Sequence, residues 1–332
     1  MARLNQRYVL QRLAIMVISI FIILSMLFFL FRQVPGGPVS AMAPGSLPAD
    51  VRARLIEQYG LDRPLSEQYV AYMVNFVQGD FGRSFYFGRP VRGVVKDRLI
   101  NTIALMLPAI LLSYTIGIYL GAHLGWIRGS RMERIEMVIV LLLRSTPVFW
   151  TGLVLLYIFG FELAWFPLGG MTSVGADNSG VADKFLSLDF AKHAALPVIS
   201  LSFYYTGLPL LLMRNNMLET LTEEYIQTAR AKGLSNRRIM LRHAARNALL
   251  PVITAFAVAI GFTVGGQVLI ETVFSWPGLG QEMVKSALRS DYPVAQATFL
   301  LLATMVIVMN FIADLMYTYL DPRVRLGASG GE

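Results

Sequence analysis

Long apolar stretches alternate with shorter polar segments along the whole chain. The first stretch, residues 13–31, contains no charged side chain. At a helical rise of about 1.5 Å per residue, such a stretch spans the roughly 30 Å hydrocarbon core of a bilayer. Together with five similar stretches it predicts six transmembrane helices, at about residues 8–31, 99–127, 137–161, 194–213, 249–274 and 294–320. The pattern therefore predicts an all-α, polytopic membrane protein.

The composition agrees with this prediction and narrows the possible chemistry. Charged side chains make up only 15% of the 332 residues, against about 25% in soluble domains. The first span follows Arg3, Arg7 and Arg12, as a secretory signal would. Its apolar core exceeds the usual signal length of about 7 to 15 residues, so we expect it to remain as a span. Cysteine is absent, which excludes disulfides and thiol chemistry.

The Lys and Arg residues of the short loops predict the orientation. Three precede the first span, three lie in the loop at 128–134 and seven lie between 214 and 246, whereas the short loops on the opposite side hold two each. Basic loops stay cytoplasmic, so both termini are expected in the cytoplasm. The segment 32–98 carries nine basic residues on the outer side, which is compatible because long loops translocate largely regardless of charge.

The outer segment and the spans contain two further patterns. Residues 51–59 and 65–77 have apolar positions at helical spacing, which predicts short amphipathic helices that either pack on the bundle or dock an external partner. Glycines repeat every four residues within two spans, which lets helix backbones approach closely and indicates packing rather than a gating hinge. These packing residues are Gly117, Gly121, Gly125, Gly261 and Gly265.

The cytoplasmic segment 219–250 is expected to form two short helices. Thr222 is a good N-cap, acidic side chains follow it where they complement the helix dipole, and Gly233 suits the end of the helix. Ser235 is expected to cap a second, basic helix that ends before Pro251. The first of these helices is too short and too polar to enter the membrane.

The run from 224 to 254 closely resembles the cytoplasmic segment of ABC importer permeases, in the version found in dipeptide, oligopeptide and nickel systems. The general signature of these permeases is a Glu-Ala-Ala triplet, a Gly after three more residues and a Pro thirteen residues later. The residues at these positions are Gln227, Thr228, Ala229, Gly233 and, five residues late, Pro251. These departures match the peptide and nickel branch, whose loop reads much like the sequence at 228–234.

Three more matches extend the resemblance over nearly the whole chain. They are Gly-Asp-Phe-Gly-Arg-Ser at 79–84, the run at 271–280 after the fifth span, and the motifs at 291–293 and 321–325 that flank the sixth span. The resemblance implies the type I ABC importer permease fold and a multi-pass protein of the bacterial inner membrane. It also implies partners, namely a homologous second permease, two ABC ATPase subunits and an external solute-binding protein.

By the same resemblance, the short cytoplasmic helix couples the chain to an ATPase subunit, with small residues permitting close docking and charged ones setting the register. The residues assigned to this contact are Glu224, Tyr225, Thr228, Ala229, Arg230, Lys232 and Gly233. A G-x-x-x-x-G-K-[ST] phosphate loop is absent, so no cofactor is expected on this chain and ATP with Mg²⁺ is expected on the ATPase partners. Peptides are the default substrate, while nickel, glutathione and oligosaccharides stay open.

Rival functions lack the residues that they need. An ion-coupled secondary transporter or channel subunit is the alternative, but ion-coupled carriers keep carboxylates at mid-membrane, where this chain has only Arg144. Arg144 is expected either to pair within the bundle or to meet a substrate carboxylate in the pathway. The chain has no H-E-x-x-H motif and no G-x-S-x-G elbow, so no metal or catalytic site is predicted. Its net charge of +8 fits topology and anionic lipid, and no nucleic-acid-binding module is recognisable.

The predicted organisation has three parts. Residues 1–94 hold the first span and the outer segment. Residues 95–320 form the transmembrane core, with five spans and the coupling segment at 219–250. Residues 321–332 are a cytoplasmic tail.

Overall fold

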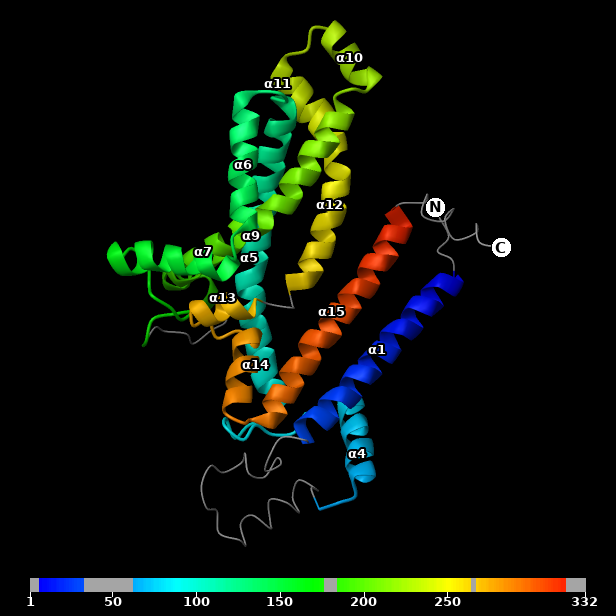
Figure 1. Cartoon of the computed structure of the whole chain (residues 1–332), viewed down its shortest axis with the longest axis vertical. Coiled ribbons are helices and arrows are strands. Elements are labelled where there is room, and N and C mark those ends of the chain that lie inside the picture. The colour runs from blue at the N-terminus through cyan, green and yellow to red at the C-terminus, as the bar shows by residue number, and fades with distance from the viewer. Residues whose placement is uncertain (1–5, 33–61, 176–183, 264–266, 321–332) are drawn as a thin grey trace. The chain divides into compact units, whose positions relative to one another are not determined.

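The computed structural model describes residues 6–32, 62–175, 184–263 and 267–320, and all regular elements within these ranges are helices (Figure 1). Five helices are long and apolar enough to cross a membrane, or six when one bent pair counts as a span. The predicted all-α membrane fold is confirmed. The short outer helix expected at 65–77 is also confirmed as α4, whereas the one expected at 51–59 lies outside the described residues.

The elements follow one another in this order: α1 (Gln6–Arg32), α4 (Leu65–Gln78), α5 (Val91–Trp126), α6 (Arg131–Ser145), α7 (Val148–Leu155), the π-helix η1 (Leu156–Glu162), α9 (Leu188–Thr220), α10 (Glu224–Ala231), α11 (Asn236–Arg238), the π-helix η2 (Ile239–Ala244), α12 (Ala245–Phe262), α13 (Val268–Val273), α14 (Leu279–Leu288) and α15 (Tyr292–Leu320). They belong to two compact units, unit 1 with Met1–Asn101 and Gly278–Glu332 and unit 2 with Thr102–Pro277. The expected boundary at 94 and 95 falls inside unit 1.

In unit 1, the first and last spans run side by side. α1 packs along α15, while α4 packs on α1 and α14 on α15 (Figure 1). Leu24, Leu27 and Leu300 are buried together in this interface. Gly79 ends α4 at φ 70°, a left-handed conformation that glycine adopts without a steric penalty. Unit 1 therefore joins the N-terminal span to the C-terminal one.

In unit 2, α9 is the central helix and packs against α6, α7 and α12. The core of the unit includes Leu105, Leu201 and Met213, all fully buried. Ser187 caps α9 by accepting a hydrogen bond from the Phe190 N–H at 3.1 Å. The helix therefore begins before the apolar stretch 194–213, and it continues seven residues beyond that stretch to Thr220.

The prediction of one continuous span at 137–161 was wrong. α6 ends at Ser145, α7 begins at Val148, and the two helices meet at an angle of 98°. Pro147 explains the break, because proline lacks an N–H and pushes the preceding residue away from helical dihedrals. Thr146 is accordingly extended, with φ −76° and ψ 131°.

The predicted span at 249–274 is also divided. α12 ends at Phe262, and α13 covers Val268–Val273. Gln267 separates them with an extended backbone at φ −136°, and its side chain donates to the Tyr205 hydroxyl at 2.7 Å. The aromatic residues that follow are packed inside unit 2, where Trp276 is fully buried and the Phe274 carbonyl accepts from the Gly170 N–H at 2.9 Å.

Candidate functional site

The short helix α10 occupies the position of the predicted cytoplasmic helix, but its cap differs from the prediction. Thr222 does not cap it: the helix begins at Glu224 with Glu223 as N-cap, and the Thr222 hydroxyl donates back to Glu219 O at 2.7 Å. The reason is that α9 extends to Thr220, so Thr222 belongs to the turn between the helices. Gly233 ends α10 as predicted, with φ +72° and its N–H donating to Arg230 O at 2.9 Å.

One face of α10 packs on the chain itself. Ile226 is fully buried and Ala229 is 5% exposed, and α10 packs on the neighbouring η2. The Tyr225 hydroxyl donates to His243 O at 3.3 Å and accepts from Asn247 Nδ2 at 2.7 Å. Ala229, which the sequence analysis assigned to a contact with an ATPase subunit, is thus largely covered by this chain.

The opposite face of α10 is exposed and carries most of the other residues assigned to the partner contact. Its exposed residues are Glu224, Gln227, Thr228, Arg230 and Lys232. Gly233 is exposed too, and a Cβ added there would meet no atom within 4 Å. Within this chain, Gly233 is thus required by its backbone dihedral rather than by a close contact.

The second helix of the segment 219–250 is continuous with the following span. Ser235 is its N-cap residue, as predicted, although its side chain makes no capping bond. The prediction that the helix ends before Pro251 was wrong, because α12 continues through the proline to Phe262. A proline inside a span is tolerated when neighbouring groups satisfy the backbone. Asn216 of α9 supplies such a contact in the same turn, donating to Ala248 O at 3.1 Å.

A buried ion pair fixes α9 near the point where it leads into α10. Glu133 of α6 is 5% exposed and accepts hydrogen bonds from both Arg214 Nε, at 2.9 Å, and Arg214 Nη2. It also accepts from the Gly129 N–H at 2.6 Å. Sequence reasoning missed this pair, since its members are 81 residues apart. The only local signal was Ser130, which caps α6 three residues before Glu133 and is typical of a capping box.

Three glycines bring α5 against α9 in the same region. A Cβ built at Gly121 would lie 2.5 Å from Leu210 O, and one at Gly125 would lie 2.6 Å from Met217 Cβ. Gly117 lies similarly close to Pro209. Gly261 lies in α12, and Gly265 lies outside the described residues. The first three glycines thus allow a backbone approach that larger residues would block.

Arg144 lies in the last turn of α6, just before the bend at Pro147. A Cβ added to Gly207 of α9 would be 2.8 Å from Arg144 Cδ, so the aliphatic part of the side chain lies on the glycine. The residue is exposed, and among the described residues no carboxylate forms an ion pair with it. The intramolecular pairing that sequence reasoning offered as one role of Arg144 is therefore not found there.

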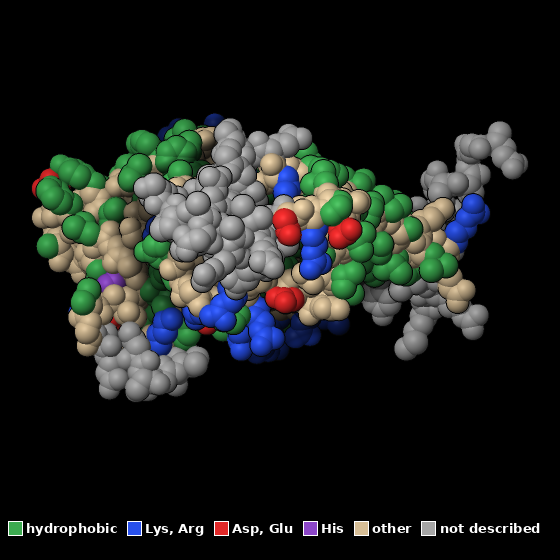
Figure 2. Space-filling model, turned by 90° about the horizontal axis from the view of Figure 1, so that it is seen from below, with side chains coloured by type: hydrophobic (Ala, Val, Ile, Leu, Met, Phe, Trp, Pro, Cys, Tyr) green, Lys and Arg blue, Asp and Glu red, His purple; other side chains and the backbone are tan. Residues whose placement is uncertain are grey.

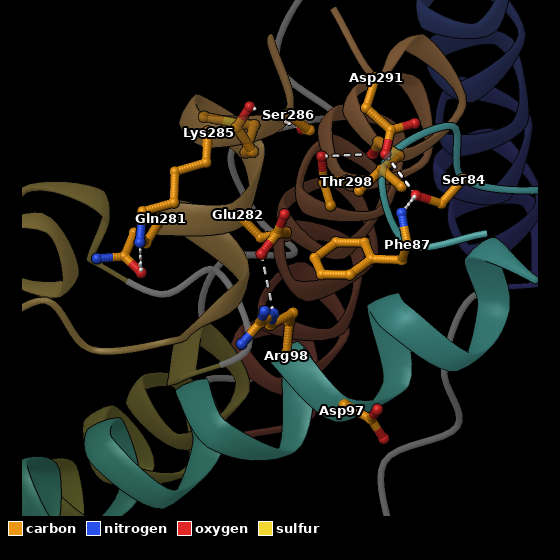
Figure 3. Close-up of polar contacts among 12 residues, drawn as sticks. Ser84, Phe87, Asp97, Arg98, Gln281, Glu282, Lys285, Ser286, Asp291 and Thr298 are labelled. Carbon is orange, nitrogen blue, oxygen red and sulfur yellow. Dashed lines mark hydrogen bonds and ion pairs between the residues drawn. The ribbon is translucent and has the colours of Figure 1, made fainter. Parts of the chain in front are cut away.

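In unit 1, two of the sequence motifs contact each other (Figure 3). Asp291, which is 2% exposed, accepts from Ser84 Oγ at 2.5 Å and from the N–H groups of Phe85 and Tyr86 at 3.1 and 3.2 Å. The Asp-Tyr-Pro motif thereby holds the end of the Gly-Asp-Phe-Gly-Arg-Ser motif at the start of α15. This contact joins residues about 200 positions apart.

A second buried carboxylate lies next to this contact. Glu282 of α14, 3% exposed, faces Arg98 at 2.9 Å and Arg289 at 3.7 Å (Figure 3). Burial, and then the positive charge of Arg289, lower the pKa of the neighbouring Lys285. Figure 2 shows Lys and Arg side chains gathered on one face with Asp and Glu between them. The charged cluster around Glu282 therefore contains both signs.

The described residues contain no group of three or more His, Asp or Glu side chains that could hold a metal ion. α10 is a polar helix with one exposed face, and its other face packs on this chain. A three-residue turn joins it to α9, which is held by the ion pair of Arg214 with Glu133.

Comparison with known proteins covers nearly the whole chain. Residues 113–326 match the family described as "Binding-protein-dependent transport system inner membrane component", and residues 5–106 match its N-terminal counterpart. The chain is 36% identical to the di/tripeptide transport system permease protein DppB of Pseudomonas aeruginosa over 330 residues, 96% of this chain and 98% of the relative. It is 37% identical to the oligopeptide transport system permease protein AppB of Bacillus subtilis over 298 residues, 90% and 92% of the two chains. The dipeptide permease DppB of Escherichia coli K12 is 35% identical over 335 residues, 96% and 98% of the two chains.

Proposed function

The chain belongs to the binding-protein-dependent transport system inner membrane component family and is a permease subunit of an ABC importer, and on that premise we propose that it imports peptides, with α10 as its contact with the ATPase. The observation that carries the substrate class is the full-length similarity to permeases named for dipeptides, tripeptides and oligopeptides. Nickel, glutathione and oligosaccharides are the competing substrates.

The chain is expected to work in a complex. Its partners are a homologous second permease, two ABC ATPase subunits that bind ATP and Mg²⁺, and an external solute-binding protein. The chain itself carries no cofactor and no catalytic site in this proposal. Its two termini and α10 face the cytoplasm, in line with the basic residues of the loops on that side.

The anchoring of α10 supports its role as a lever. Its inner face is fixed through Ile226 and through the two hydrogen bonds of Tyr225. The turn at 221–223 leads directly into α9, whose cytoplasmic end is clamped by Glu133 and Arg214. A displacement of α10 by closing ATPase subunits would therefore move α9 and α6 with it, as rigid elements do in domain rearrangements.

Arg144 is assigned to the pathway in this proposal. Its guanidinium is exposed and has no ion-pair partner among the described residues, and an unpaired charge at membrane depth is a functional feature more often than a structural one. We expect it to meet the terminal carboxylate of a peptide. Uptake by Arg144→Leu should fall for a dipeptide but not for its C-terminal amide, with Arg134→Leu as the matched control. An equal loss for both substrates would contradict the assignment.

The function is tested with the complete complex in proteoliposomes that contain ATP, the binding protein and a labelled dipeptide. We expect accumulation that requires ATP and persists when proton and sodium gradients are dissipated. Accumulation driven by a gradient without ATP would support the ion-coupled alternative. Uptake of nickel, glutathione or an oligosaccharide in place of peptides would overturn the substrate class alone.

A further inference from the structure

A cavity of about 200 Å³ lies in unit 1. It lies among α1, α4, the loop after α4 and the start of α15. Its walls are mainly aromatic and include Phe28, Phe31, Tyr72, Phe76, Phe81 and Tyr292. The importer mechanism described above uses none of these residues.

Tyr72, which lines this cavity, has a buried hydroxyl without a hydrogen-bond partner among the described residues. The Tyr72 hydroxyl is inaccessible to solvent and makes no hydrogen bond among the described residues. Tyr69, one turn earlier on α4, is satisfied by Ser25 Oγ at 2.7 Å. Burial raises the pKa of Tyr72 to about 12, so the phenol stays protonated and can donate. A buried donor without an acceptor costs free energy, which a bound acceptor would recover.

A positive charge lies on the same wall. Arg32, the last residue of α1, lines the cavity with its guanidinium 4.8 Å from the centre of the Phe28 ring, and no carboxylate pairs with it among the described residues. Two other charged residues line the cavity, and both are engaged in their own loop. Arg83 donates to Gly88 O at 2.6 Å, and Asp80 accepts from the Gly82 N–H at 2.9 Å. The described residues of the lining therefore carry a net charge of +1, from two Arg against one Asp.

The position of Arg32 indicates which anion is available. α1 has 27 residues, which corresponds to about 40 Å of helix against a hydrocarbon core of roughly 30 Å. Its last residue therefore lies at the level of the lipid headgroups. The same end of α1 exposes large apolar side chains, with Met26 at 70%, Phe29 at 46% and Leu30 at 59%. Acyl chains would cover these residues beside the cavity.

We propose that this cavity binds the phosphate of a glycerophospholipid, held by the Arg32 guanidinium and the Tyr72 hydroxyl, with its acyl chains along the exposed face of α1. The volume suits this occupant. The cavity of about 200 Å³ has room for a group several times the size of one water molecule, such as a phosphate. Sites that enclose larger organic ligands such as peptides measure about 300 to 1,000 Å³.

The test measures phospholipid retained by the purified complex. Dioleoylphosphatidylethanolamine is titrated onto delipidated complex, and the bound lipid is counted by native mass spectrometry. Removing a charged hydrogen bond is expected to weaken binding about 10-fold or more in Arg32→Gln, and removing a neutral one about 5-fold in Tyr72→Phe. Arg32→Lys should retain most of the binding, because it keeps the charge. The control variants are Arg92→Gln and Tyr119→Phe, which alter exposed residues on α5.

Two arms separate the lipid from other anions. Thermal stabilisation by a given concentration of added lipid should be smaller in Tyr72→Phe than in the wild type, while the melting temperature without lipid stays near that of the wild type. Phosphoethanolamine and a dipeptide, added at the same concentration, should not compete. The proposal is overturned if the control variants lose as much lipid as Arg32→Gln, if Tyr72→Phe binds like the wild type, or if the dipeptide displaces the lipid.

Discussion

The approach of α5 to α9 gives a sharp test of the packing, through a single methyl group at Gly121. A Cβ at this position would lie 2.5 Å from Leu210 O, 2.8 Å from Met213 Cβ and 3.1 Å from Arg214 N. Two of these are backbone atoms of α9 and cannot move without the helix. Overpacking a close contact costs about 1 to 3 kcal/mol, and distances this short put Gly121→Ala at the upper end of that range.

Helix propensity works in the opposite direction. Replacing a helical glycine by alanine contributes about 1 kcal/mol of stability when space allows. Gly93 provides the matched control, because it lies in the same helix and a Cβ there would meet no atom within 4 Å. We therefore expect Gly121→Ala to lose about 2 kcal/mol and Gly93→Ala to gain about 1 kcal/mol.

The assay is thermal unfolding in detergent, followed by the fluorescence of the four tryptophans. A change of 1 kcal/mol shifts the melting temperature by about 2 to 4 °C in soluble chains of 150 to 250 residues, so Gly121→Ala should melt roughly 4 to 8 °C lower and Gly93→Ala a few degrees higher. An unchanged melting temperature for Gly121→Ala, or an equal loss in both variants, would refute the close approach of the two helices.

Of three further predictions, two concern buried carboxylates and one concerns the turn at Gly233. Glu133→Gln should lower stability by about 3 kcal/mol in thermal unfolding, because it leaves a largely buried guanidinium without its anion, whereas Arg131→Gln at an exposed position should change little. Gly233→Ala should reduce ATP-driven uptake more than Gly233→Asn, since asparagine tolerates positive φ better than alanine; equal uptake by the two would remove the backbone argument. Asp291→Asn should cost about 2 kcal/mol through weaker bonds to its three donors, and a similar loss in the exposed Asp97→Asn would show that the burial of Asp291 is unimportant.

The lengths of the apolar runs predicted where the spans lie, but they did not predict whether each span is one continuous helix. The apolar run at 8–31 yields α1 almost unchanged, because one uninterrupted stretch allows no other arrangement in a bilayer. The run at 137–161, which contains Arg144, is also long enough to span a bilayer, yet it bends by 98°. Pro147 marked the place, but the sequence alone gives neither the size nor the direction of a bend, since both depend on what the second helix packs against.

The candidate site shows the same division between local and distant information. Gly233 was predicted as a helix end, because the left-handed dihedral is a local requirement that glycine meets. The pairs Glu133 with Arg214 and Ser84 with Asp291 were not predicted, because their members are 81 and 207 residues apart. The burial of Ala229 was not predicted, since an eight-residue helix has too few positions to reveal which face is buried.

Crosslinking tests the central claim that the exposed face of α10 contacts the ATPase. The chain contains no cysteine, so one introduced cysteine reports one position. Gln227→Cys, on the exposed face of α10, is combined with a short photoactivatable crosslinker in the assembled complex, and Leu250→Cys, 65% exposed in α12, serves as the control. We predict a covalent adduct with the ATPase subunit from position 227 and none from position 250. Absence of that adduct from position 227, or equal adducts from both positions, would contradict the assignment of α10.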